Sequence, residues 1–279
     1  MTAPVNLVVG CGYLGLRVAR LWRDAGAHVL ALTRSPDRAD ALAAEGLEPV
    51  LGDVTTPSGI PALPAVDAIF WGVGFDRTAG ATYRDVHVAG LGRVLDAVPA
   101  APRVVFSSST GVWGTDDGAV VDEKTPAHPV REAGRVLLEA EALLHARTGD
   151  RGTVLRFAGL YGPGRLPRLD DLKAGRPIAA DPDSWLNLIH ADDAARIVVA
   201  VAAAKQARPL YVVSDGVPVK RRDWYEHLAK RSGSPPPTFD ITAERTRGAD
   251  KRVNPSLLFH DFPLALAYPD AFRGIDATV

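Results

Sequence analysis

The sequence predicts an α/β protein built on a doubly wound, Rossmann-type parallel sheet, with a small C-terminal lobe. Short runs rich in β-branched and aromatic residues alternate with segments of helical periodicity, which is typical of a parallel sheet covered on both faces. A glycine-rich turn follows the first of these runs directly. The chain has 279 residues and is 47% hydrophobic, which suits one large domain or one domain with a smaller lobe.

Seven strands and five helices are predicted from these runs. The strands cover residues 5–9, 29–33, 48–51, 68–71, 103–107, 153–157 and 210–213. The helices cover residues 14–25, 39–44, 82–97, 131–146 and 191–204. Because connections between parallel strands are right-handed, we expect all seven strands to lie in one sheet.

Two regions interrupt the alternation. Residues 159–182 are rich in Gly, Pro and Arg, and residues 216–279 contain a proline run at 235–237. We expect both regions to leave the sheet and form the small lobe over its C-terminal edge. The sequence therefore predicts a Rossmann domain in residues 1–158 and, in residues 159–279, a mixed segment that completes the sheet and forms the lobe.

Charge and composition exclude several classes of protein. The 32 Lys and Arg residues nearly balance 33 Asp and Glu residues, without a basic stripe, so we expect neither nucleic acid nor an anionic membrane as a partner. Cys11 is the single cysteine, which excludes an internal disulfide and fits a reducing compartment. The N-terminal segment resembles a strand rather than a signal peptide, and the longest apolar run, residues 197–204, is too short to cross a bilayer. We expect a cytoplasmic protein without a metal site, and the oligomeric state stays open.

The glycine-rich turn has the GxGxxG spacing of a dinucleotide-binding site, between a strand and a helix. Gly10 permits the tight turn, Gly12 lets the backbone approach a pyrophosphate, and Gly15 allows the helix to pack closely on the strand. The helix N-terminus offers N–H groups and a favourable dipole to the phosphates, so we also expect Tyr13 and Leu14 at the cofactor. A glycine turn that serves packing alone is the alternative.

The end of the second strand indicates NADP rather than NAD, although NAD stays possible. NAD-specific sites usually carry an acidic residue there, which binds the ribose 2′-hydroxyl. Here the segment 31–38 reads ALTRSPDR, so Arg34 follows the strand without a carboxylate. A planar guanidinium suits a 2′-phosphate, and a solvated loop arginine is the alternative.

Three further residues complete the predicted cofactor site. Asp53 follows the third strand and would lie near the adenine, with a turn-forming aspartate as the alternative. Gly72 and Ser107 stand at the ends of the fourth and fifth strands, where the carboxyl ends of parallel strands meet the ligand.

Three motifs in order resemble the short-chain dehydrogenase/reductase superfamily, in its NAD-dependent epimerase/dehydratase branch. They are FSSSTGVWG at 106–114, RFAGLYGPGR at 156–165 and NLIHADDAA at 187–195. The resemblance covers nearly the whole chain. It implies a Rossmann fold, a nicotinamide cofactor and a small-molecule substrate held by the C-terminal lobe.

The chain departs from this family at its acid/base pair. The family places a YxxxK tyrosine and lysine on the helix after the fifth strand, where this chain reads AGRVLLEAE at 133–141. Ala133 stands in the tyrosine position and Leu137 in the lysine position. The ammonium of such a lysine lowers the tyrosine pKa so that the phenol can exchange a proton with substrate. The chain therefore resembles atypical members that keep the cofactor fold without the usual pair.

Two residues are the candidate catalytic groups. Ser109 matches the family serine whose hydroxyl holds the substrate oxygen, and a strand-end serine bonded to backbone is the alternative. His190 would lie at the cleft, and a structural histidine at a strand end is the alternative. Four loop acids are weaker candidates, because such acids are usually solvated: Asp116, Asp117, Asp122 and Glu123. Thr110 and Gly111 replace the Asp-Glu pair of the family's sugar dehydratases, which argues against dehydration.

Two functions follow as hypotheses. The first is an NAD(P)-dependent oxidoreductase or epimerase-like enzyme that prefers NADP and acts on a small polar or carbonyl substrate. Arginines 165, 168 and 176 could then meet an anionic group, or be solvated. The second is a non-catalytic NADP-binding sensor or scaffold. Ser109 favours the enzyme, whereas Ala133 and Leu137 favour the binding protein.

Overall fold

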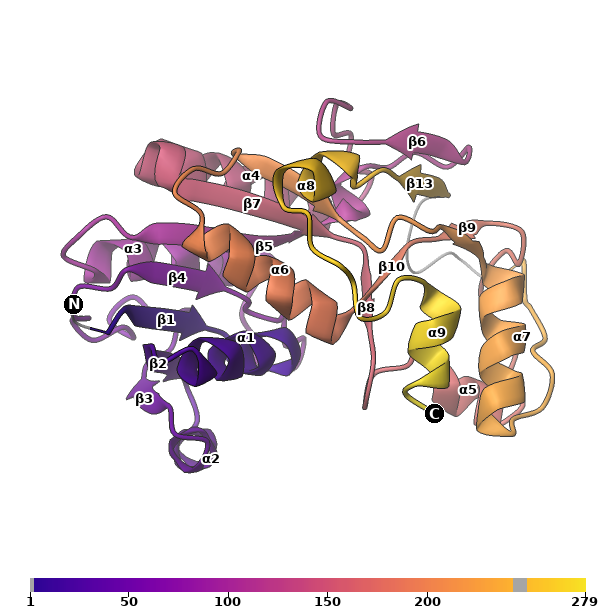
Figure 1. Cartoon of the computed structure of the whole chain (residues 1–279), viewed down its shortest axis with the longest axis horizontal. Coiled ribbons are helices and arrows are strands. Elements are labelled where there is room, and N and C mark those ends of the chain that lie inside the picture. Colours follow the sequence, from indigo (N-terminus) through magenta and orange to yellow (C-terminus); the bar gives the residue numbers. More distant parts are fainter. Residues whose placement is uncertain (1–2, 243–249) are drawn as a thin grey trace. The chain divides into compact units, whose positions relative to one another are not determined.

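The computed structural model describes residues 3–242 and 250–279. It contains a seven-stranded parallel sheet in the order β11-β7-β5-β4-β1-β2-β3 (Figure 1). The strands are Val5–Val9 (β1), His28–Thr33 (β2), Glu48–Leu51 (β3), Ala68–Trp71 (β4), Arg103–Ser109 (β5), Gly152–Phe157 (β7) and Leu210–Val213 (β11). All seven predicted strands are present and share one sheet, which confirms the predicted Rossmann-type fold.

The central strands are buried along most of their length rather than on alternate residues. In β1, Leu7 pairs with Leu30 of β2 on one side and with Ile69 of β4 on the other. All three side chains are at most 1% exposed. Strands with continuous burial need cover on both faces, which is what the helices between them supply.

Five helices connect these strands: Tyr13–Asp24 (α1), Pro36–Ala44 (α2), Gly90–Ala97 (α3), Glu132–Thr148 (α4) and Ala191–Ala203 (α6). In Figure 1, α1 and α6 pass in front of the sheet, whereas α3 lies behind it, and α4 packs against α3. Local sequence explains the start of α2, because the Ser35 hydroxyl accepts a hydrogen bond from the N–H of Arg38 and Pro36 occupies the first turn.

The helix predicted over residues 82–97 is present from Tyr83 to Ala97, but residues 85–89 are wound more widely than an α-helix. A π-helical turn, Asp85–Ala89 (η1), comes before α3. A reciprocal cap stands at the start of this segment: the N–H of Thr82 donates to the Asp85 carboxylate, and the N–H of Asp85 donates to the Thr82 hydroxyl. This cap fixes the start of the helical segment, and the wider turn follows it.

By their contacts, the described residues form two compact units. Unit 1 comprises Met1–Ser109, Arg131–Arg156 and Ala195–Tyr211, and unit 2 comprises Thr110–Val130, Phe157–Ala194 and Val212–Val279. Both regions that interrupt the sequence pattern fall in unit 2, although part of 216–279 lies outside the described residues. The division at residue 158 into a cofactor part and a substrate part stays a prediction.

Unit 2 is held by short strand pairs and small helices. Its two-stranded sheets pair Ala119–Val121 (β6) with Lys251–Val253 (β13), Gly159–Tyr161 (β8) with Leu188–His190 (β10), and Trp185–Leu186 (β9) with Val219–Lys220 (β12). Its helices are Leu169–Lys173 (α5), Arg221–Ser232 (α7), Ser256–Asp261 (α8) and Ala271–Asp276 (α9). A 3-10 turn covers Thr110–Val112 (η2) in unit 2, and another covers Gly149–Arg151 (η3) in unit 1. Tyr161, Trp224 and Ile275 lie in its core, each with no exposed surface. Among the described helices of both units, none is long and apolar enough to span a membrane.

Candidate cofactor and active site

The three glycines of the turn between β1 and α1 have different surroundings. Gly10 adopts φ +89°, and a Cβ there would lie 2.6 Å from the backbone of Val73. A Cβ at Gly15 would lie 2.2 Å from the carbonyl oxygen of Gly10. At Gly12, by contrast, no described atom lies within 4 Å of the Cβ position. The backbone at Gly12 therefore faces open space, whereas the other two glycines are packed against neighbouring backbone.

The N-terminus of α1 has the properties of an anion-binding site. No side chain of the described residues caps it, and its first turn holds no acidic residue. The first backbone N–H groups and the helix dipole are thus directed at the open space beside Gly12. These features fit a dinucleotide pyrophosphate, so the turn could hold the cofactor that the sequence predicts.

Arg34, at the end of β2, forms an ion pair with a carboxylate. Its Nη2 lies 2.5 Å from Oδ2 of Asp76, in the loop that follows β4. Hydrogen bonds from the hydroxyl and N–H of Thr78, together with Arg34, lower the pKa of Asp76 to about 2. Sequence reasoning missed Asp76, because nothing in the local pattern predicts that a loop 42 residues away reaches Arg34.

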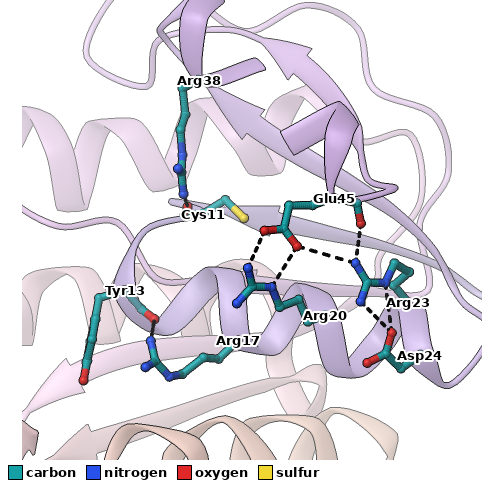
Figure 2. A network of polar contacts seen from close by, with 8 residues as sticks. All are labelled: Cys11, Tyr13, Arg17, Arg20, Arg23, Asp24, Arg38 and Glu45. Carbon is teal, nitrogen blue, oxygen red and sulfur yellow. Dashed lines mark hydrogen bonds and ion pairs between the residues drawn. The ribbon is translucent and has the colours of Figure 1, made fainter. Parts of the chain in front are cut away.

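Arg38 is a second guanidinium that the sequence analysis did not single out. It lies on α2, and its Nη2 donates to the carbonyl oxygen of Cys11 at 2.9 Å, inside the glycine-rich turn (Figure 2). The same view shows Arg20 of α1 bonded to the carboxylate of Glu45, directly after α2. The available signal was a second arginine four residues after Arg34, in the first turn of α2. Burial raises the pKa of the Cys11 thiol to about 11, which keeps it protonated and fits a small spacer residue.

Asp53 and Gly72 occupy turns around this site. Oδ1 of Asp53 accepts hydrogen bonds from the N–H and the hydroxyl of Thr55, at 2.8 and 2.7 Å. This is the turn-forming arrangement that the sequence left open as the alternative. Gly72 donates its N–H to the carbonyl of Val9, and the Gly72 backbone lies against Gly10. Contacts of Asp53 and Gly72 with cofactor stay predictions.

The three serines at the end of β5 point alternately to two faces. Ser108 is buried, whereas Ser107 and Ser109 are partly exposed. Residues two apart on a strand share a face, so Ser107 and Ser109 lie together, opposite Ser108. The Ser108 hydroxyl donates to Oε1 of Glu141 on α4, at 2.6 Å.

Glu141 also forms the buried ion pair of unit 1. Its two carboxylate oxygens accept from Nε and Nη2 of Arg156 on β7, at 3.1 and 2.7 Å. Both side chains are less than 10% exposed. This bidentate pair ties α4 to β5 and β7 and fixes the face that β5 turns toward the helix.

α4 carries no replacement for the family acid/base pair. Ala133 is exposed near its start, and Leu137 is 5% exposed within the core of unit 1. Leu137 therefore serves packing, as its place in the apolar stripe predicted.

His190 lies in unit 2 at the end of β10 and has no exposed surface. Its ring stacks on Tyr268 with 3.6 Å between centroids and meets the edge of Tyr161. Its Nδ1 accepts from the N–H of Asp192 at 3.3 Å. This environment favours the structural alternative, and a catalytic role for His190 stays an untested prediction.

Other predicted polar residues of unit 2 have structural contacts. The carboxylate of Asp193 accepts from the N–H groups of Ala267 and Tyr268, at 2.9 and 2.8 Å. Arg168 and Arg176 both pair with Asp171. Sequence reasoning also missed Asp215, two residues after the end of β11, whose burial raises its pKa to about 7.

The chain matches the model of one protein family along most of its length. Residues 6–214 match the NAD dependent epimerase/dehydratase family. Protein YeeZ of Escherichia coli K12 is 29% identical over 272 residues, covering 94% of this chain and 96% of YeeZ. The 2'-dehydrokanamycin reductase of Streptomyces kanamyceticus is 28% identical over 258 residues, covering 87% of this chain and 70% of the reductase.

A solved structure has the same fold along nearly the whole chain. The structure of a conserved protein from Silicibacter pomeroyi superposes with a TM-score of 0.80 at 28% identity, covering 99% of this chain and 98% of that protein. The resemblance seen in the sequence motifs is thereby confirmed. The chain belongs to the NAD-dependent epimerase/dehydratase family.

Proposed function

We propose that the chain is an oxidoreductase or epimerase-like enzyme that prefers NADP and acts on a small polar or carbonyl substrate. The observation that carries this proposal is the open backbone at Gly12, at the uncapped start of α1, with Arg34 at the end of β2. The similarity to a protein named a reductase supports the same class of reaction.

We assign a role in cofactor or substrate binding to each of these residues. The turn at Gly12 and the N-terminus of α1 bind the pyrophosphate, and Arg34 binds the 2′-phosphate. When bound, the nicotinamide supplies or accepts the hydride. Ser109 orients the substrate oxygen through a hydrogen bond from its hydroxyl.

Because the family tyrosine and lysine are absent, we expect a low rate of turnover. Losing a positioned acid or base typically lowers the rate by about 10²–10⁴-fold, so turnover rests on orientation and on a proton donor outside α4. His190 is the second candidate donor after Ser109, and its full burial in unit 2 weighs against it.

A second function has its own support. Leu137 is buried in the core and Ala133 has no functional group, so α4 is built for packing rather than for proton transfer. This observation favours a non-catalytic NADP-binding sensor or scaffold.

An absorbance screen distinguishes the enzyme from the sensor or scaffold. It measures NADPH oxidation and NADP reduction across small carbonyl compounds and sugars. We expect turnover by the wild type and a loss of about 100-fold in kcat/KM in Ser109→Ala, with unchanged NADPH affinity. Ser58→Ala, at an exposed loop serine, is the matched control. Robust turnover that Ser109→Ala leaves intact would refute the site, whereas tight NADPH binding without turnover would favour the sensor.

A further inference from the structure

The carboxylate of Asp76 occupies the partner position that a bound 2′-phosphate would need. Oδ2 of Asp76 lies 2.5 Å from Nη2 of Arg34, and both side chains remain about half exposed, at 43% and 50%. The pair is therefore open to solvent, and an anion can reach the guanidinium. A phosphate that does so meets a carboxylate already bound there.

The loop that carries Asp76 belongs to the same end of unit 1 as the glycine-rich turn. β4, β1 and β2 are neighbours in the parallel sheet, so their carboxyl ends lie side by side. The backbone of Gly72 and Val73, directly after β4, packs against Gly10. Asp76 follows on the same loop and reaches Arg34 at the end of β2.

The loop itself holds the Asp76 carboxylate in place. Oδ1 accepts from the N–H and the hydroxyl of Thr78, at 2.9 and 2.6 Å, whereas Oδ2 faces Arg34. Asp76 is thus fixed by its own loop, and Arg34, on a long flexible stem, is the partner that can turn away. The low pKa of Asp76 keeps it charged throughout the physiological range.

We propose that Asp76 is a specificity-determining residue, which competes with the 2′-phosphate of NADP for Arg34 and thereby limits the preference over NAD. This inference rests on the proposed NADP-binding function. When NADP binds, Arg34 must leave the Asp76 carboxylate and bind the 2′-phosphate instead. The negative charge of Asp76 stays close to that phosphate. Binding of NAD leaves the Arg34–Asp76 pair intact, so Asp76 keeps the site open to both cofactors.

The test is a calorimetric titration of NADPH and NADH into the wild type and Asp76→Asn. Asparagine keeps the size of the side chain and an oxygen for Thr78 but removes the charge. We expect Asp76→Asn to tighten NADPH binding about fivefold and to change NADH binding less than about twofold. Asp37→Asn, an exposed acid on α2, removes the same charge and should change NADPH binding less than about twofold.

The Arg34→Ala variant tests whether Asp76 competes with the 2′-phosphate for Arg34 or only repels the phosphate. In that background Asp76→Asn should lose most of its effect on NADPH, because no guanidinium remains to be released. Equal NADPH affinities in the wild type and Asp76→Asn, with NADPH still preferred over NADH, would overturn the role of Asp76 alone. If neither protein prefers NADPH, or neither binds a cofactor, the proposed NADP preference fails as well.

Discussion

The glycines in the turn after β1 have different roles. Substitution of one should affect cofactor binding, whereas substitution of another should affect folding. Gly12 has φ −91° and ψ −139°, outside the α and β regions, and beyond its chain neighbours no described atom lies within 4 Å of its Cβ position. Gly15 has no such room, because its Cβ position lies 2.2 Å from the carbonyl oxygen of Gly10. Adding a side chain therefore blocks the space for a ligand at Gly12 and disrupts packing at Gly15.

The first prediction follows from this contrast. Gly12→Val should abolish NADPH binding and lower the thermal midpoint much less than Gly15→Val, whose added side chain meets the carbonyl of Gly10. Gly92→Ala, on α3, adds a Cβ at ordinary contact distance and should leave NADPH binding unchanged without lowering the midpoint. Calorimetry and thermal unfolding check these outcomes. Unchanged NADPH affinity in Gly12→Val would contradict the assignment of this turn.

Sequence reasoning at this scale found the residues but not their partners. The glycine spacing and Arg34 are local patterns, and local physics is enough to single them out. Asp76 and Arg38 act through contacts with residues 42 and 27 positions away. Only the folded sheet brings those segments together, so no local pattern could have predicted the ion pair.

Among the elements, α4 is fixed by a buried charge. Glu141 accepts hydrogen bonds from Arg156 and Ser108, and all three side chains are nearly inaccessible. Removing one member of a buried pair leaves an unpaired charge, which typically costs about 3–5 kcal/mol. This network joins one helix to two strands and fixes the orientation of the serines on β5.

The second prediction concerns this helix. Glu141→Ala should lower the free energy of unfolding by about 3–5 kcal/mol, as measured by denaturant titration. Glu132→Ala, which breaks an exposed pair with Arg135 on the same helix, should cost less than about 1 kcal/mol. Similar losses in the two variants would show that the buried network does not anchor α4.

Helix periodicity predicted α4 and its apolar stripe, including the burial of Leu137. It could not predict Glu141 as a buried residue, because a glutamate in a helix is usually exposed. The π-helical turn Asp85–Ala89 was also beyond the sequence pattern. Periodicity does not distinguish such a turn from an α-helix, and the capping contacts of Thr82 with Asp85 lie where the helical segment starts.

At the scale of the whole molecule, the free energy of unfolding should depend on pH because Asp215, a carboxyl group in unit 2, is buried. Burial, with a smaller contribution from Asp270, raises the pKa of Asp215 to about 7. One of its oxygens accepts from the N–H of Val217, and the other has no hydrogen-bond partner among the described residues. The folded chain then binds this proton more tightly than the unfolded chain does.

The third prediction is the direction of that dependence. Stability from Asp215 should fall as the pH rises from about 4 through about 7, and Asp215→Asn should remove this fall. His87, whose pKa burial lowers to about 4, acts oppositely below about pH 6.5, so the comparison is between variants at each pH. Asp150→Asn, in the exposed turn after α4, is the control. Parallel stability curves for the wild type and Asp215→Asn would contradict the buried carboxyl.

The sequence predicted the large sheet far better than unit 2. Most strands of the large sheet are apolar runs of four to seven residues that alternate with helices, so their pattern is strong. The strands of unit 2 are two or three residues long and pair distant segments, such as Lys251 with Ala119. Such short strands carry no periodicity of their own, because tertiary contacts form them.

The central claim is an NADP site at the glycine-rich turn, and a direct titration of NADPH and NADH into the wild type and Arg34→Ala tests it. A charge-assisted contact to the 2′-phosphate is worth about 1.5–3 kcal/mol, or about 10–150-fold in affinity, and competition from Asp76 places the preference near the lower end. We expect the wild type to bind NADPH about tenfold more tightly than NADH, and Arg34→Ala to bind both about equally. Arg135→Ala, at an exposed arginine of α4, should keep the preference. Equal affinities in the wild type, or a preference that survives in Arg34→Ala, would contradict the claim.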